Sequence, residues 1–203
     1  MPRLLHLLTP NVIVFLEVVT YLRGTPLAGP YTIVPELAEP CPKDLMGLPW
    51  DLDVKFVRDR SNPNIFFVTL NWAGQFVFDD HKEAHAVMAS WDTRGGWKEN
   101  ALVMKFKKLC ATFKTYMPDS WREMMRLLTS NVTITVRDCP FPPAAYSIRN
   151  ISSSWMQPKG LPVMYYGKWR IDTRVVDPVD KKILGCLRIY ASIVPLINRP
   201  GKR

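Results

Sequence analysis

The sequence predicts an all-β protein in which two antiparallel sheets form a β-sandwich or an open β-cup, with one or two short helices. Several short segments alternate between apolar and polar residues and are separated by turn residues, a pattern typical of antiparallel strands. Only one region follows the helical period, and the 18 prolines and 10 glycines are scattered along the chain. At 203 residues, the chain is long enough for one domain with its own core.

Short strands are expected in the middle of the chain. Residues 51–56 alternate between charged and apolar side chains, and residues 65–72 are rich in β-branched and aromatic side chains. A further strand is expected at 84–91, between turns at 79–82 and 94–96.

The clearest pattern is a hairpin near the C-terminus. Residues 168–175 and 186–193 both alternate with a period of two, and residues 177–180 form a turn rich in Asp and Pro between them. One predicted face of the first strand is apolar: Trp169, Ile171, Thr173 and Val175.

One helical region interrupts the strands. Its apolar residues recur at intervals of three or four positions, as on one face of a helix: Phe106, Leu109, Cys110, Phe113 and Met117. Pro118 is predicted to end this helix. Ser120 and Glu123 have the spacing of a capping box, which predicts a second short helix through Leu128.

The N-terminus resembles a secretory signal. An apolar run at 12–19 follows basic residues and precedes small ones, and it is too short to span a bilayer. The alternative for this run is an ordinary buried strand or helix. We therefore expect a signal peptide at 1–24, a single domain at 25–195 and a basic C-terminal tail at 196–203.

The cysteines and sequons also favour passage through the secretory pathway. Four cysteines suit disulfide bonding outside the cytosol and allow three pairings, with four reduced core cysteines as the alternative. Asn131 and Asn150 begin N-x-S/T sequons and are candidate glycosylation sites. We expect a secreted or extracellular protein, or one of the endo-lysosomal lumen.

No chemistry of catalysis is visible in the sequence. It contains no nucleophile elbow, no Gly-rich phosphate loop and no zinc-protease motif, so we expect no enzyme and no cofactor. His81 and His85 are four residues apart, but nothing in the sequence completes a metal site. The net charge of +9 admits nucleic acid as a partner. A secretory leader argues against that, and the basic residues fit a solvated helix face or attraction to anionic lipid headgroups.

An unusually apolar loop precedes the hairpin. Loops usually run over the surface and are polar, but this one, interrupted by Pro158 and Gly160, carries large apolar side chains: Trp155, Met156, Leu161, Val163, Met164, Tyr165 and Tyr166. Either the loop folds onto its own core, or it forms a surface that meets lipid. Flexible Met and amphipathic Tyr and Trp suit the second alternative.

Three motifs resemble a known family. They are C-P-F-x-x-x-x-Y-S from Cys139, G-x-W-R-I-D from Gly167 and L-G-C-L-R-I-x-A-S from Leu184. This C-terminal part is similar to the ganglioside-activator proteins and to the wider ML lipid-recognition superfamily, including its secreted insect members. The similarity is specific from Cys139 onward and loose from Cys41 to Cys110. The chain departs from the family at Ala144 and Ala145, where a glycine usually precedes the tyrosine.

The resemblance implies an immunoglobulin-like pair of sheets around an apolar cavity, with the apolar loop at its rim. It also implies which cysteines pair: Cys41 with Cys186, and Cys110 with Cys139. The function it implies is non-enzymatic lipid binding or transfer, with an acyl chain or glycolipid in the cavity and a membrane surface, receptor or enzyme as further partner. The alternatives are a secreted β-sandwich that binds protein, as a receptor-associated or adhesion module, and a carrier of small hydrophobic ligands or pheromones.

Overall fold

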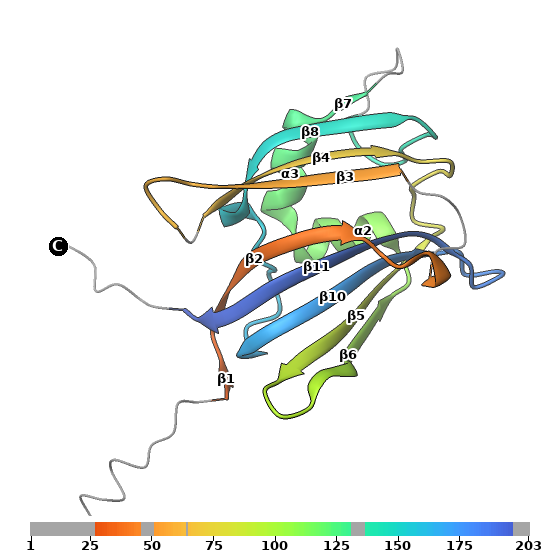
Figure 1. Ribbon diagram of the computed structural model, residues 1–203. Helices are drawn as coiled ribbons and strands as arrows, with labels where there is room; N and C mark the ends of the chain where they lie inside the picture. Colours follow the sequence, from red (N-terminus) through yellow and green to blue (C-terminus); the bar gives the residue numbers. More distant parts are fainter. Residues whose placement is uncertain (1–26, 46–50, 64, 131–136, 197–203) are drawn as a thin grey trace, which may run out of the picture.

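The computed structural model describes residues 27–45, 51–63, 65–130 and 137–196. It is an all-β structure with two main antiparallel sheets and two short helices, as the sequence predicts (Figure 1). The expected signal peptide at 1–24, the sequon at Asn131 and most of the basic tail lie outside the described residues.

The larger sheet has five strands and contains the predicted hairpin. Its strand order is β2 (Tyr31–Pro40), β11 (Ile183–Pro195), β10 (Gly167–Val176), β5 (Glu83–Asp92) and β6 (Gly96–Phe106). Trp169 lies opposite Ala191, and Asp172 lies opposite Arg188. The alternation predicted for β10 and β11 is therefore confirmed, with the apolar face directed into the protein.

The second sheet has four strands. Its order is β3 (Asp51–Arg58), β4 (Phe66–Ala73), β8 (Ala145–Ser152) and β7 (Thr129–Ser130). A third pairing joins the two-residue strands β1 (Ala28–Gly29) and β9 (Met164–Tyr165). Two single-turn helices complete the described elements: η1 (Lys43–Leu45) and η2 (Ser153–Trp155).

The helices differ in detail from the sequence prediction. Helix α2 (Leu109–Tyr116) begins only after Phe106, which ends strand β6 and is not helical. Pro118 does not merely end α2; it is the first residue of α3 (Pro118–Leu127), where proline costs no backbone hydrogen bond. The predicted capping box is wrong, because Ser120 lies inside α3 and its Oγ donates to the Trp155 carbonyl oxygen at 2.5 Å.

The two sheets meet along β2 and β3. These edge strands lie next to each other without pairing, and α2 and α3 lie behind both sheets (Figure 1). Helix α3 packs against β8, and α2 packs against β5. The sheets and helices thus surround a common interior.

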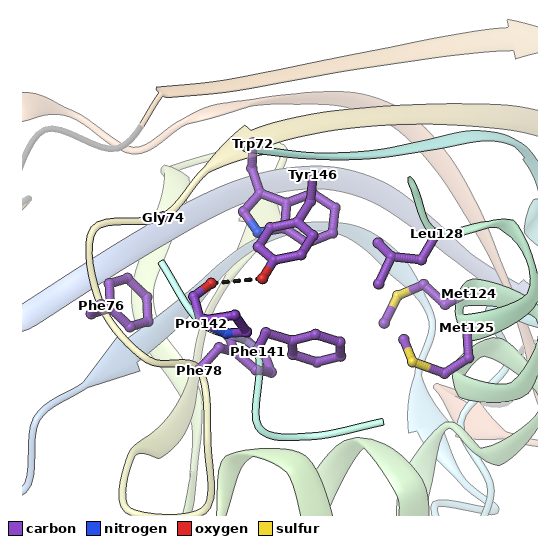
Figure 2. A pocket seen from close by; sticks show the side chains of 10 residues that line it. All are labelled: Trp72, Gly74, Phe76, Phe78, Met124, Met125, Leu128, Phe141, Pro142 and Tyr146. Atoms are coloured by element: carbon purple, nitrogen blue, oxygen red, sulfur yellow. Dashed lines mark hydrogen bonds between the residues drawn. The ribbon is translucent and has the colours of Figure 1, made fainter. Parts of the chain in front are cut away.

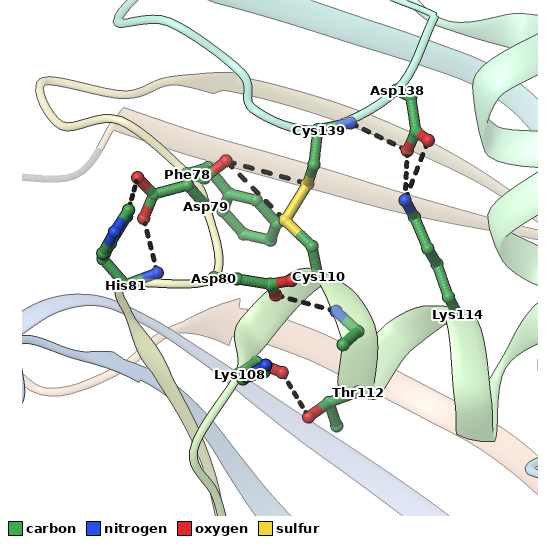
Figure 3. The surroundings of a disulfide bond; sticks show 11 residues. Phe78, Asp79, Asp80, His81, Lys108, Cys110, Thr112, Lys114, Asp138 and Cys139 are labelled. Carbon is green, nitrogen blue, oxygen red and sulfur yellow. Dashed lines mark hydrogen bonds and ion pairs between the residues drawn. A yellow bond between two sulfur atoms is a disulfide. The ribbon is translucent and has the colours of Figure 1, made fainter.

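Both disulfide bonds that the family resemblance implies are present. Cys41–Cys186 joins the end of β2 to β11 and closes a loop of 145 residues. Cys110–Cys139 ties α2 to the segment that enters β8 (Figure 3). Both of its sulfurs lie 3.8 Å from the Phe78 carbonyl oxygen; disulfide sulfurs carry no hydrogen, so these are contacts and not hydrogen bonds.

Candidate functional site

The interior between the sheets contains apolar side chains that are only partly buried. On the five-stranded sheet, Ile171, Leu187 and Ile189 share the inward face with buried Trp169. The four-stranded sheet directs a similar set inward: Val54, Phe56 and Leu70. We call these six residues the inner surface. The inner faces of a closed sandwich interdigitate, whereas here both faces keep side chains that are only partly buried.

The buried core of the described chain is divided in the same way. The rim-end cluster (Met88, Met164, Trp169 and Ile193) combines three residues of the five-stranded sheet with Met164 of β9. The α3 cluster (Val68, Ile148 and Ile151) lies on the four-stranded sheet beneath α3. These two clusters share no residue, buried or partly buried. Besides the contact of β2 with β3, the two sheets are joined around the Cys110–Cys139 bond, where Phe78 and Phe113 pack against clusters on both sides.

A small apolar pocket lies at this joined end (Figure 2). Its volume is about 40 Å³, and ten residues line it: Trp72, Gly74, Phe76, Phe78, Met124, Met125, Leu128, Phe141, Pro142 and Tyr146. Helix α3 provides the two methionines on one side. On the other side, Trp72 stacks on Tyr146 with ring centroids 5.1 Å apart, and the Tyr146 hydroxyl donates to the Pro142 carbonyl oxygen at 2.6 Å.

The apolar loop, residues 155–166, passes from one sheet to the other; we call it the rim loop. Met156 packs against the α3 cluster, and Met164 is part of the rim-end cluster. Met164 is only 9% exposed, so it is a core residue and not part of an exposed rim. Tyr166 is partly buried against the same cluster, and Leu161 is also partly buried.

Hydrogen bonds hold the rim loop against three other elements. The Gln157 side chain accepts from the Ile33 amide and donates to the Ile33 carbonyl oxygen, both at 3.3 Å, which fastens the loop to β2. The Lys159 amide donates to the Tyr116 carbonyl oxygen at the end of α2. Together with the Ser120–Trp155 bond, these contacts fasten the loop to β2, α2 and α3.

The remaining loop residues are exposed and join an apolar surface. Val163 is 55% exposed and Tyr165 is 64% exposed. Two further exposed residues lie next to strands β1 and β11, Leu27 and Leu196. The backbone brings them together, since Tyr166 N–H donates to the Leu27 carbonyl oxygen and Leu196 N–H donates to that of Pro30. We call Leu27, Val163, Tyr165 and Leu196 the rim patch. Trp155, on η2, is also exposed.

A buried ion cluster lies on the opposite, outward face of the five-stranded sheet. Arg188 donates to both carboxylate oxygens of Asp172, at 2.7 and 3.0 Å, and Arg174 donates at 3.3 Å. Burial alone would raise the pKa of Asp172, but the hydrogen bonds and charges of Arg188 and Arg174 outweigh it and lower the pKa below its ordinary value. The Asp172 carboxylate therefore stays ionised although it is buried.

The other candidate residues lie apart from this interior. Asn150 is exposed on β8 at a bulge, with φ of 58°. His81 pairs with Asp79 and His85 pairs with Glu83, and the described residues contain no group of three or more potential metal ligands. None of the helices in the described ranges is long and apolar enough to cross a membrane.

Sequence reasoning missed the helix side of the interior. Met124, Met125 and Leu128 were predicted to lie on a short helix, but nothing in their spacing indicated that they face Trp72 and Tyr146. Leu27 and Leu196 were also missed, because they reach the rim only through long-range backbone hydrogen bonds.

Comparison with known proteins adds no family assignment: no family model matches the chain, and no curated protein matches it.

Proposed function

We propose that this protein is a secreted, non-enzymatic lipid-binding protein that holds an acyl chain between its two sheets. The observation that carries the proposal is the inner surface. Inward-facing apolar side chains from both sheets remain partly exposed, and the buried clusters on either side share no residue. The resemblance of the C-terminal motifs to lipid-recognition proteins favours the same function.

The free energy for such binding comes from apolar surface. Burying one methylene group is worth about 0.8 kcal/mol, so a chain of about a dozen carbons gains roughly 10 kcal/mol before ordering costs. The partly exposed faces of Ile171, Leu187 and Ile189 would gain burial at the same time. No side-chain chemistry is needed for this function.

Helix α3 supplies the movement that the ligand requires. The apolar pocket of about 40 Å³ has room for only a few atoms, so an acyl chain that extends from the inner surface into this pocket must displace part of the pocket wall. Met124 and Met125 form that wall, and unbranched methionine side chains adapt to different shapes at low cost. We propose that α3 shifts outward as the lipid enters.

The rim patch would guide the protein to a membrane. Leu27, Val163, Tyr165 and Leu196 lie together at the open end, and exposed apolar patches mark sites of contact with membranes or partners. The net charge of +9 favours anionic headgroups.

A cavity-filling substitution tests the proposal. Ile189→Trp adds an indole to the inner surface, and Val103→Trp, on the exposed outward face of β6, is the matched control. Lipid transfer between phosphatidylcholine vesicles should fall at least about tenfold in Ile189→Trp, with the melting temperature unchanged, and should be normal in Val103→Trp. If the interior is filled, Ile189→Trp overpacks it and costs about 1–3 kcal/mol of stability, which would contradict the proposal.

Secretion is proposed from the two disulfide bonds, which form in oxidising compartments. The exposed Asn150 sequon then predicts a glycan on protein from secreting cells. Treatment with a glycosidase should lower the mass. In the Asn150→Gln variant, the mass lost on glycosidase treatment should be smaller by the glycan that this site carries. An unchanged mass in wild type would count against the secretory route.

A secreted β-sandwich that binds protein is the second candidate, and the small size of the apolar pocket favours it. In that case the rim patch would bind a protein and the interior would need no ligand. The Ile189→Trp comparison separates the two, because only the lipid proposal expects a stable variant that no longer carries lipid.

A further inference from the structure

The outward face of the five-stranded sheet carries an aromatic cluster that the proposed function does not use. Trp91 and Trp97 meet edge to face, with ring centroids 5.2 Å apart and planes at 70°. Trp97 meets Tyr190 in the same way, at 5.9 Å and 64°. Trp91 remains 45% exposed, although the solvent-facing side of an antiparallel sheet is usually polar.

A pocket of about 230 Å³ lies beside this cluster, and we call it the outer pocket. Glu36 and Lys168 flank its aromatic wall of Trp91, Trp97 and Tyr190. These residues come from five strands that the register brings to one end of the sheet, where β10 begins and β11 ends (Figure 1). The pocket is thus built by the sheet and not by a loop.

The polar groups of the outer pocket have hydrogen-bond donors and acceptors that a ligand could use. One oxygen of Glu36 accepts from the Ser192 hydroxyl at 2.5 Å, and its second oxygen has no partner in the described chain. Lys168 forms no hydrogen bond or ion pair with any described residue. Arg170, by contrast, is engaged: it pairs with Glu99 and lies over the Trp97 ring, 5.4 Å from the centroid.

The chemistry of these groups selects one class of ligand. An anion would meet the Glu36 carboxylate, and a cation would meet Lys168. A cage for an ammonium group needs space between ring faces, but these rings are in contact with one another. A neutral ring with an apolar C–H face and a rim of hydroxyl groups fits all parts: the C–H face contacts the indole, and the hydroxyls donate to Glu36 and accept from Lys168.

We infer that the outer pocket binds one pyranose unit of a neutral carbohydrate. Trp91 provides the apolar wall, and Glu36 and Lys168 orient the hydroxyl groups. Trp169 and Ala191 also line the pocket, but its Lys168 and Tyr190 alternate along the strands with these two residues, whose side chains are buried on the inner side. The charged and exposed aromatic groups of the pocket therefore lie on the opposite side of the sheet from the inner surface. The inference therefore does not depend on lipid binding.

Saturation-transfer NMR with the methyl glycosides of glucose, galactose and mannose tests the inference. We expect transfer from the C–H face of at least one glycoside. Trp91→Ala should weaken its binding by about tenfold or more, and Glu36→Gln and Lys168→Gln should each weaken it several-fold. Trp155→Ala is the matched control, since Trp155 is 42% exposed but lies on η2, and it should bind as wild type.

Three results would overturn the inference: no transfer from any of the glycosides, wild-type affinity in all three pocket variants, or competition by choline chloride or sodium phosphate. The charge variants keep the test decisive if Trp91→Ala fails to fold, because Glu36→Gln and Lys168→Gln each change an exposed side chain.

A second experiment, with vesicles of phosphatidylcholine that contain neutral glycosylceramide, distinguishes a soluble glycan from a glycolipid as the source of the sugar. Binding of free glycoside alone indicates a soluble glycan, and additional Trp91-dependent vesicle binding indicates a glycolipid headgroup.

Discussion

Met164 and Tyr165 are neighbours in β9 but have opposite environments. Met164 is 9% exposed and packs with Met88, Trp169 and Ile193, whereas Tyr165 is 64% exposed on the rim patch. Successive residues of a strand point to opposite faces, so each side chain has a separate role. Met164 is a core residue, and Tyr165 is an exposed residue of the proposed membrane contact.

Serine substitutions should separate these roles. Tyr165→Ser should change the free energy of unfolding by no more than about 0.5 kcal/mol but should clearly reduce binding to phosphatidylserine vesicles. Met164→Ser should cost about 2–5 kcal/mol, because it removes a buried side chain. Thermal melts measure the change in stability, and vesicle sedimentation measures membrane binding. Trp169→Ala is the control for loss of a core side chain, and it is expected to cost about 3–5 kcal/mol. Normal vesicle binding by Tyr165→Ser would exclude the rim patch as a membrane contact.

The Asp172 carboxylate makes stability depend on pH. Its pKa is lowered in the folded protein by Arg188 and Arg174, so its contribution is fully present above the unfolded pKa of about 3.9 and is lost as the pH falls through the folded pKa. At neutral pH, Asp172→Asn should cost about 3 kcal/mol, because the arginines keep buried charge without a partner.

Urea unfolding at several pH values measures this effect. The stability of the wild type should fall more steeply below about pH 4 than that of Asp172→Asn, and Asp53→Asn, an exposed carboxylate, should follow the wild type. Parallel curves for the wild type and Asp172→Asn would show that Asp172 does not carry the acid sensitivity.

Single residues could be predicted from sequence where a local period decides their environment. Trp169 was predicted as core from alternation alone, and it is buried. Met164 could not be assigned in this way, because its packing partners Met88 and Ile193 are far away in sequence.

At the scale of elements, β3, β4, β5, β10 and β11 were predictable, and β2 and β6 were not. Strand β2 contains Pro35, which lies at a bulge opposite Ala191; proline is tolerated at bulges but masks the strand pattern. In β6, Phe106 falls by chance on the apolar face predicted for the next helix. Helix α2 begins instead at Leu109, and Asp80, from the turn before β5, accepts from the Ala111 amide at 2.9 Å (Figure 3).

The two disulfide bonds connect elements over very different distances. In the chain-entropy model, the 145-residue loop of Cys41–Cys186 is worth about 5 kcal/mol, and the 29-residue separation of Cys110–Cys139 about 3.6 kcal/mol. Replacing each pair by Ser should therefore lower the free energy of unfolding in that order. Urea denaturation of the two double variants measures the difference, and equal losses would show that native packing decides the effect and not loop closure.

At the scale of the whole molecule, the sequence predicted the two-sheet architecture but not how α3 and the rim loop sit against the sheets. Long-range contacts such as Gln157 with Ile33 set that arrangement. The rim loop itself was recognisable, because seven large apolar residues in a loop need an explanation beyond local structure. The helix wall of the apolar pocket had no comparable local pattern.

Native mass spectrometry of protein from secreting cells tests the central claim most directly. The protein is first incubated with phosphatidylcholine vesicles and purified away from them. The lipid proposal predicts a mass excess over polypeptide and glycan that organic extraction removes, with the released lipid identified in the extract and absent from the Ile189→Trp variant. A mass of polypeptide and glycan alone in every charge state, before and after incubation, would contradict the proposal that the sheets enclose a lipid.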